Sequence, residues 1–214
     1  MAGLIDRGAE ALRAGAPLFT RRNLFHACLR AGGDTALTEA KFAAALRRRL
    51  AGGPVPGLLG QGRRAPSSAR RLEASGGFPL AVILVDRRPL VDLLAGLDAL
   101  APTPIAVVCV DGTPAPVVEW LKRGFRGGRR APVLYLHDAA TVLYPFTLEP
   151  LATALREGAA GPAAYADLGL PPLGATPRRF GDPTLPVGEL VFNVEAIPPA
   201  TLLRFCTSAA RRLA

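Results

Sequence analysis

Histidine and cysteine are scarce in this chain, which has two histidines and three cysteines among its 214 residues. Cys28, Cys109 and Cys206 lie far apart in the sequence, so they show neither the paired spacing of a zinc site nor the density of a disulfide scaffold. We expect three buried thiols. Because His26 and His137 are the only histidines, no multi-histidine metal site can form, and a metal would need carboxylate ligands.

Long apolar segments are also missing. The longest one covers residues 80–85, whereas a helix that spans a membrane needs about 20 apolar residues. Near the start, Asp6 and Arg7 stand where a secretory signal would have a basic end followed by an apolar run. We therefore expect a cytoplasmic protein, open to association with the nucleoid, that has no membrane partner.

Acidic residues are few in one part of the chain only. Residues 1–75 hold 13 basic and 5 acidic side chains and so account for +8 of the net charge of +9. The chain has two lysines, and the codon bias of a GC-rich genome would explain this preference for arginine but not the local scarcity of acids. Such an uneven charge is typical of a surface that binds a phosphate backbone.

Residues 1–58 are expected to form a small, basic helical domain. Apolar residues recur at helical spacing over residues 3–14, after the N-cap candidate Thr20, and again after Thr38. The candidate DNA-binding residues of this domain are its clustered arginines, namely Arg21, Arg22, Arg47, Arg48 and Arg49. Because arginines at a helix C-terminus also suit the helix dipole, a purely structural role is an equal alternative for the last three.

Residues 59–77 predict a linker, since they are rich in Gly, Pro, Ser and Arg and lack periodicity. This segment adds Arg63 and Arg64 to the DNA-binding candidates. The lack of apolar side chains predicts that the linker is mobile.

Residues 78–214 are expected to form an α/β domain. Apolar strands over 81–85, 105–110 and 132–136 alternate with helices that begin at Pro89 and cover 117–125. This order predicts a mostly parallel, Rossmann-like sheet with right-handed crossovers. A further strand is expected over 190–194 and a closing helix over 201–213, with four inward residues, Leu202, Leu203, Phe205 and Cys206.

An aspartate follows each of the three predicted strands, at Asp86, Asp111 and Asp138. The carboxyl ends of parallel strands meet at one edge of a sheet, which is where ligands bind in such folds. Clustered carboxylates are typical ligands of Mg²⁺, so Mg²⁺ is the cofactor that this pattern allows. The alternative is structural, because an aspartate after a strand commonly caps the next helix or turns the chain.

The order of these motifs resembles the A subunit of type IIB DNA topoisomerases, the topoisomerase VI family, which joins a winged-helix domain to a Toprim domain. The similar segments cover much of the chain. Residues 20–26 resemble the stretch that carries the nucleophilic tyrosine of the family. In the second domain, residues 82–87 place Asp86 at the Toprim glutamate, residues 112–114 resemble the Gly-x-Pro turn, residues 138–140 resemble the Asp-x-Asp motif, and residues 168–170 and 194–197 resemble the closing segments. The resemblance implies a winged-helix-like domain over 1–58 and a Toprim-like domain over 78–214. It places Asp86 and Asp138 at the metal ligands of the family, and a metal-dependent nuclease could use Asp111 or Glu195 in addition.

Three departures fall on the chemistry of the family. Phe25 and His26 stand in place of the tyrosine, Asp86 replaces the glutamate, and Ala140 replaces the second acid of the Asp-x-Asp pair. Covalent strand cleavage needs a nucleophile and two or three metal ligands together. His26 is the remaining candidate nucleophile, with Asp86 and Asp138 as the other catalytic candidates, although one histidine on an apolar helical face is more often a packing residue.

Three functions follow from these features. The leading prediction is a topoisomerase-VI-A-like protein that binds DNA through its basic helical domain and has lost or altered strand cleavage. The second is an active Mg²⁺-dependent nuclease that uses the strand-end carboxylates. The third is a non-catalytic scaffold that pairs with an ATPase partner subunit, and a homodimer is a further assembly that the resemblance allows.

Overall fold

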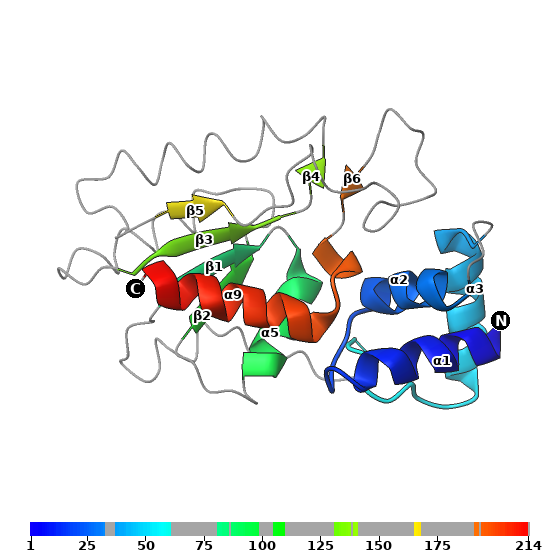
Figure 1. Cartoon of the computed structure of the whole chain (residues 1–214). Helices are drawn as coiled ribbons and strands as arrows, with labels where there is room; N and C mark the ends of the chain where they lie inside the picture. The colour runs from blue at the N-terminus through cyan, green and yellow to red at the C-terminus, as the bar shows by residue number, and fades with distance from the viewer. Residues whose placement is uncertain are drawn as a thin grey trace.

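The computed structural model describes residues 1–32, 37–60, 81–85, 87–98, 105–109, 131–137, 139–140, 165–167, 191–192 and 194–213. Three N-terminal helices pack together at one end of the molecule, and a parallel sheet with two covering helices forms the other (Figure 1). The fold is therefore a mixture of helices and a parallel sheet, as the α/β prediction required. None of the helices in the described ranges is long and apolar enough to cross a membrane.

The helical part contains α1 (Ala2–Arg13), α2 (Arg21–Gly32) and α3 (Glu39–Ala51), close to the predicted ranges. Both predicted caps are confirmed. The Thr38 hydroxyl accepts a hydrogen bond from the Lys41 amide at 3.2 Å, and the Thr20 hydroxyl accepts one from the Asn23 amide at 3.1 Å. The Asn23 side chain accepts a bond from the Thr20 amide at 2.9 Å in return, so two of the four orphan amides at the start of α2 are satisfied.

Aromatic side chains fill the core between these helices. Phe25 on α2 and Phe42 on α3 are fully buried, with ring centroids 5.3 Å apart in a tilted arrangement. Phe19 joins the same core and pairs with the segment that follows α3: its amide donates to Gly57 at 2.9 Å, and its carbonyl accepts from Leu59 at 2.9 Å. The prediction of a compact helical unit is confirmed, and its winged-helix identity stays a prediction.

Four parallel strands make the sheet: β1 (Ala81–Val85), β2 (Ile105–Cys109), β3 (Val133–Leu136) and β5 (Tyr165–Asp167), in the order β2-β1-β3-β5. The three adjacent parallel strands predicted from the apolar runs are confirmed. A short antiparallel pair, β4 (Ala139–Ala140) with β6 (Val191–Phe192), lies apart from this sheet. Of the strand expected over 190–194, the described residues Val191 and Phe192 form β6, whereas Val194 already belongs to the 3₁₀ helix η2 (Val194–Ala196).

Helices α5 (Arg88–Asp98) and α9 (Pro199–Leu213) cover one face of the sheet (Figure 1). The alternate β1 residues Ala81, Ile83 and Val85 share a core with Leu90 and Leu94 of α5. From α9, the same core receives residues four apart, Leu202, Cys206 and Ala210. The helix predicted between β1 and β2 and the closing helix are therefore confirmed. The helix predicted over 117–125 lies outside the described residues.

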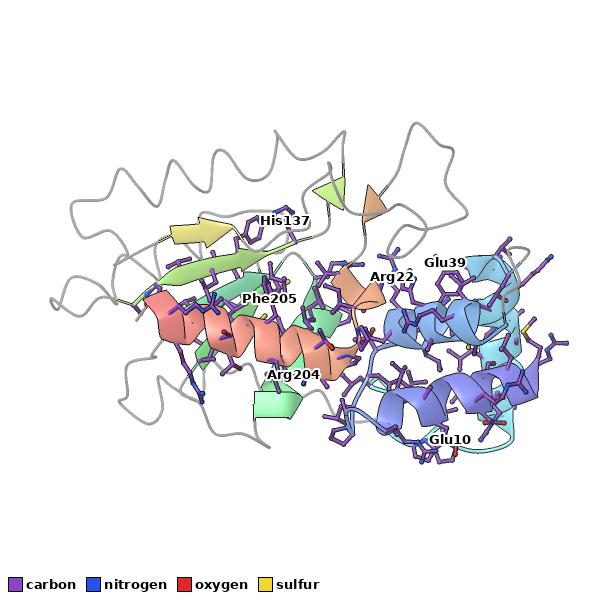
Figure 2. The ribbon with its side chains drawn as sticks, viewed as in Figure 1. Glu10, Arg22, Glu39, His137, Arg204 and Phe205 are labelled. Carbon is purple, nitrogen blue, oxygen red and sulfur yellow. The ribbon has the colours of Figure 1, made fainter. Side chains whose placement is uncertain are left out.

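One predicted core residue is wrong. Phe205 was expected to face inward, yet its side chain is 48% exposed, while Leu203 is only partly buried (Figure 2). The reason is the helical period of 3.6 residues: with Leu202 and Cys206 at the centre of the buried stripe, the position before Cys206 turns about 100° away from it.

Two of the three thiols lie in the interior. Burial raises the pKa of Cys28 to about 11 and the pKa of Cys206 to about 12, whereas Cys109 at the end of β2 is half-buried. None of the three cysteines forms a disulfide bond. The expectation of buried thiols is confirmed for Cys28 and Cys206, whereas Cys109 is only half-buried.

Candidate nucleic-acid site

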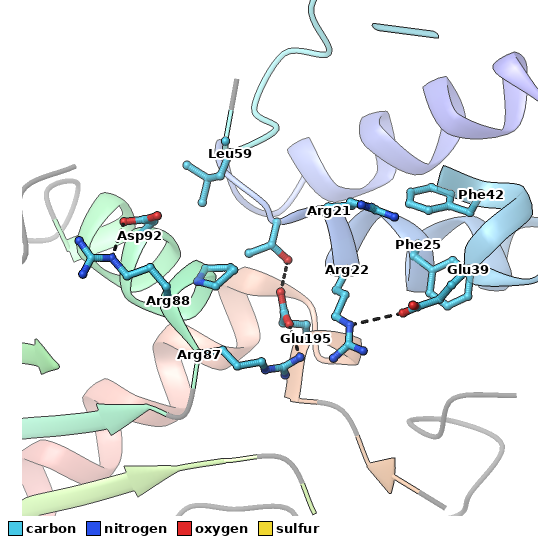
Figure 3. A pocket seen from close by; sticks show the side chains of 13 residues that line it. Arg21, Arg22, Phe25, Glu39, Phe42, Leu59, Arg87, Arg88, Asp92 and Glu195 are labelled. Atoms are coloured by element: carbon cyan, nitrogen blue, oxygen red, sulfur yellow. Dashed lines mark hydrogen bonds and ion pairs between the residues drawn. The ribbon is translucent and has the colours of Figure 1, made fainter. Parts of the chain in front are cut away.

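A cleft lies between the helical part and the sheet, where the start of α2 faces the start of α5 (Figure 3). We call it the α2–α5 cleft; its volume is about 700 Å³, within the range of ligand sites in proteins. Residues from both ends of the sequence line it: Thr20, Arg21, Arg22, Phe25, Glu39, Phe42, Leu59, Gly60, Arg87, Arg88, Pro89, Asp92 and Glu195.

Arginines stand on both sides of this cleft. Arg21 and Arg22 are the first residues of α2, and Arg88 is the first residue of α5. Neither helix has an acidic residue in its first turn. A cation at a helix N-terminus opposes the helix dipole, and this lowers the stability of the helix by about 0.3–1 kcal/mol per residue. This placement does not serve helix stability. The lining holds four arginines and three carboxylates, Glu39, Asp92 and Glu195, and so carries a formal charge of +1.

Two ion pairs of the cleft differ in exposure. Arg22 Nε lies 3.4 Å from Glu39 Oε1 with both side chains more than a third exposed, and solvent-exposed pairs of this kind contribute about 0–1 kcal/mol. Arg88 Nε lies 4.0 Å from Asp92 Oδ1, a long contact to an oxygen that is itself buried. Arg21 is exposed and has no ion pair with a residue in the described ranges. Arg21 is thus the arginine of the cleft that is open to an incoming anion, whereas Arg22 and Arg88 would have to exchange a carboxylate partner.

Glu195 at the back of the cleft is held differently. Its side chain is 2% exposed; Oε2 lies 3.0 Å from Arg87 Nη1, and Oε1 accepts a hydrogen bond from the Thr20 hydroxyl. The Glu195 carbonyl also accepts a bond from Asn23 Nδ2 at 2.7 Å. The carboxylate is therefore balanced by a cation and a hydroxyl of the protein. It joins the capped start of α2 to the segment before α9, and a metal would have to compete with both partners.

A second contact between α2 and η2 lies at the other end of α2. Arg30 near the end of α2 donates from Nη1 to the Ala196 carbonyl at 3.0 Å, and burial lowers the pKa of its guanidinium. Helix α2 thus holds the short η2 helix through its first turn and its last turn. The cleft consequently has one wall from residues 20–25 and a back formed by residues more than 170 positions later.

The predicted metal and catalytic acids Asp86, Asp111 and Asp138 lie outside the described residues. What the structure shows is the edge they were expected to share: Val85 pairs with Cys109 and with Leu136, so β1, β2 and β3 end side by side. Among the residues that are described, no group of three or more His, Cys, Asp or Glu side chains could hold a metal ion.

His26 is a core residue of α2. It is 5% exposed, its ring centroid lies 5.4 Å from that of Phe25, and it does not line the cleft. This placement agrees with the packing alternative. His137, directly after β3, is also buried, and its ring lies 4.9 Å from that of Tyr135.

The arginine cluster of α3 forms a second basic region. Arg47 and Arg48 are exposed, whereas Arg49 bonds to Asp6 at 2.8 Å and to the Gly53 carbonyl at 3.3 Å. Eight residues separate Arg47 from Glu39 in the cleft, which is about 12 Å along the helix. The DNA-binding candidates therefore divide into a cleft set and a distal set, and Arg63 and Arg64 lie outside the described residues.

The sequence did not single out Arg88 or Leu59 as site residues. Arg88 could have been found from the run Arg87-Arg88-Pro89, since proline favours the first turn of a helix and arginines there oppose its dipole. Nothing local points to Leu59, which reaches the cleft because its amide pairs with Phe19.

Comparison with known proteins adds no relative: no protein-family model matches the chain, and neither a curated protein nor a solved structure matches it.

Proposed function

We propose that this protein is a topoisomerase-VI-A-like, DNA-binding protein that does not cleave strands through a covalent intermediate. One observation carries the binding part: the exposed arginines of α3, Arg47 and Arg48, lie within residues 1–75, the segment that supplies +8 of the net charge of +9. Arginine side chains neutralise phosphates and release counterions, which drives DNA binding of any sequence.

The loss of cleavage is supported by the surroundings of two candidate residues. His26, which stands where the family has its tyrosine, is packed against Phe25 in the core and so cannot reach a phosphodiester without opening α2. Glu195 has Arg87 and Thr20 as partners, and these reduce its availability to Mg²⁺. A Mg²⁺-dependent nuclease remains the second proposal, because β1, β2 and β3 end along one edge of the sheet.

Two measurements test this proposal. A labelled duplex should bind with an affinity that falls steeply with salt and depends little on sequence. Incubation with supercoiled DNA and Mg²⁺ or Mn²⁺, followed by denaturant, should trap no protein on DNA and produce no nicks. Metal-dependent nicking without a covalent adduct would favour the nuclease, and absence of any DNA binding would favour a scaffold that meets an ATPase subunit.

A covalent adduct has its own control. If one forms, His26→Ala should abolish it when histidine is the nucleophile, and Ala140→Asp should strengthen it by restoring the missing acid. An adduct from the unchanged chain that His26→Ala removes would overturn the proposal that cleavage has been lost.

A further inference from the structure

We propose that the α2–α5 cleft binds a single strand of nucleic acid, two or three nucleotides of which cross it between Arg21 and Arg88. The inference rests on the proposed function and names the form of DNA that this part of the surface recognises. Its basis is the cleft between two walls that carry positive charge at their rims (Figure 3).

The size of the cleft selects the ligand. A volume of about 700 Å³ suits a ligand of small-molecule size. A duplex, whose major groove alone is about 12 Å wide, must stay outside such a cleft. A few linked nucleotides fit, because single-strand sites follow one backbone through a basic groove.

The charges of the cleft suit a chain of phosphates better than one isolated anion. Arg21 and Arg22 come from the α2 wall, whereas Arg88 comes from the α5 wall, and in Figure 3 Arg88 points away from the other two. Successive phosphates of one strand can therefore meet the arginines of the two walls in turn. A phosphate at these positions would exchange with Glu39 in the exposed pair to Arg22 and with Asp92 in the 4.0 Å contact to Arg88.

Apolar groups lie between the two walls. Leu59 is half-buried and Pro89 is exposed, and both line the cleft. Bases of a single strand have apolar faces that are covered in a duplex, so these residues can contact them without reading the sequence. The cleft is thus expected to bind single strands with little base preference.

The experiment measures salt slopes for two ligands. Fluorescence anisotropy of a labelled oligothymidylate of roughly ten nucleotides, and of a labelled blunt duplex, gives the slope of log affinity against log salt concentration. In the cleft variant, Arg21→Gln with Arg88→Gln, the single-strand slope should become shallower by about 1.4, since each lost phosphate contact is worth about 0.7. The duplex slope should stay unchanged.

A matched control comes from the distal set. Arg47→Gln with Arg48→Gln removes the same charge from exposed positions outside the cleft. It should make the duplex slope shallower by about 1.8, at about 0.9 per contact, and leave the single-strand slope unchanged. Arg21→Lys with Arg88→Lys, which keeps the charge, should restore the single-strand slope.

A second measurement uses the unchanged protein, so that it does not depend on the folding of any variant. A 5′-phosphorylated thymidine dinucleotide, small enough for the cleft, should displace the labelled oligothymidylate and leave the duplex bound. An unchanged single-strand slope in the cleft variant, or equal displacement of both ligands, would overturn the cleft assignment while duplex binding still supports the proposed function. Binding of neither ligand would overturn both.

Discussion

The buried pair of Glu195 and Arg87 gives the sharpest prediction for stability. Changing Glu195 to Gln keeps the side-chain volume and an oxygen that can accept the hydrogen bond from the Thr20 hydroxyl. It removes the negative charge of the carboxylate, whose Oε2 lies 3.0 Å from Arg87 Nη1. Hydrogen bonds to charged groups contribute about 1.5–3 kcal/mol, and leaving one member of a fully buried pair costs about 3–5 kcal/mol. Because the Arg87 side chain is 24% exposed and can regain water, we expect a loss of about 2 kcal/mol.

Thermal and urea unfolding followed by circular dichroism measure this change. A loss of this size should lower the Tm by about 4–8 °C in a chain of this length. The matched control is Glu39→Gln, since the exposed Glu39–Arg22 pair lies at 3.4 Å and its loss should cost no more than about 0.5 kcal/mol.

A double-mutant cycle separates the pair from the rest of the network. Arg87→Met, alone and combined with Glu195→Gln, should give a coupling energy of about 1.5 kcal/mol. A coupling below about 0.5 kcal/mol, the level of an exposed pair, would refute the view that Arg87 fixes the Glu195 carboxylate, to which Thr20 of the helical part donates its hydrogen bond.

Two further predictions concern the buried thiols, and a third concerns the tight turn at Gly57. A thiol reagent at about pH 8.5 should label Cys109 of the folded protein quickly and Cys28 and Cys206 slowly, because burial raises the pKa of the last two to about 11 and 12; fast labelling of all three would contradict this. The unfolded thiols ionise near 9.0 while the folded ones keep their protons, so the free energy of unfolding should fall as the pH rises above that value. Gly57→Ala should destabilise by about 1–3 kcal/mol, because the glycine has φ +85° and a Cβ would lie 2.6 Å from the Pro17 carbonyl; Gly53→Ala, with φ +130° and open space, should cost less in the same urea titration.

Local sequence patterns predicted the elements of the fold well. Thr20 and Thr38 cap helices because their hydroxyls satisfy amides three residues away, an interaction that depends only on neighbouring residues. The strands β1, β2 and β3 were predictable because both of their faces are covered, which requires continuous apolar runs. Phe205 was wrongly placed in the core because it is apolar and lies next to the buried stripe of its helix, and its residue type alone does not distinguish it from the residues within that stripe.

The candidate site was less predictable because distant segments build it. Arg21 and Arg22 were singled out from local charge, but their neighbour Arg88 comes from the start of α5, more than 60 residues later. Glu195 was expected to be a metal ligand. The residues near it in the sequence do not indicate that its carboxylate interacts with Thr20 and Arg87. Pairings of this kind depend on how the sheet and the helices pack, which the sequence pattern does not encode locally.

The long separation between Thr20 and Glu195 also sets the order in which the protein can be completed on the ribosome. The core of the helical part lies within residues 5–55, so these helices can associate early in synthesis. The hydroxyl of Thr20 meets its carboxylate partner only after 175 further residues have been added, which takes roughly 10–35 s at 5–20 residues per second. Until then, the side of α2 that η2 later covers stays open to water or to a chaperone, and the nascent helical part has no partner to fix its orientation.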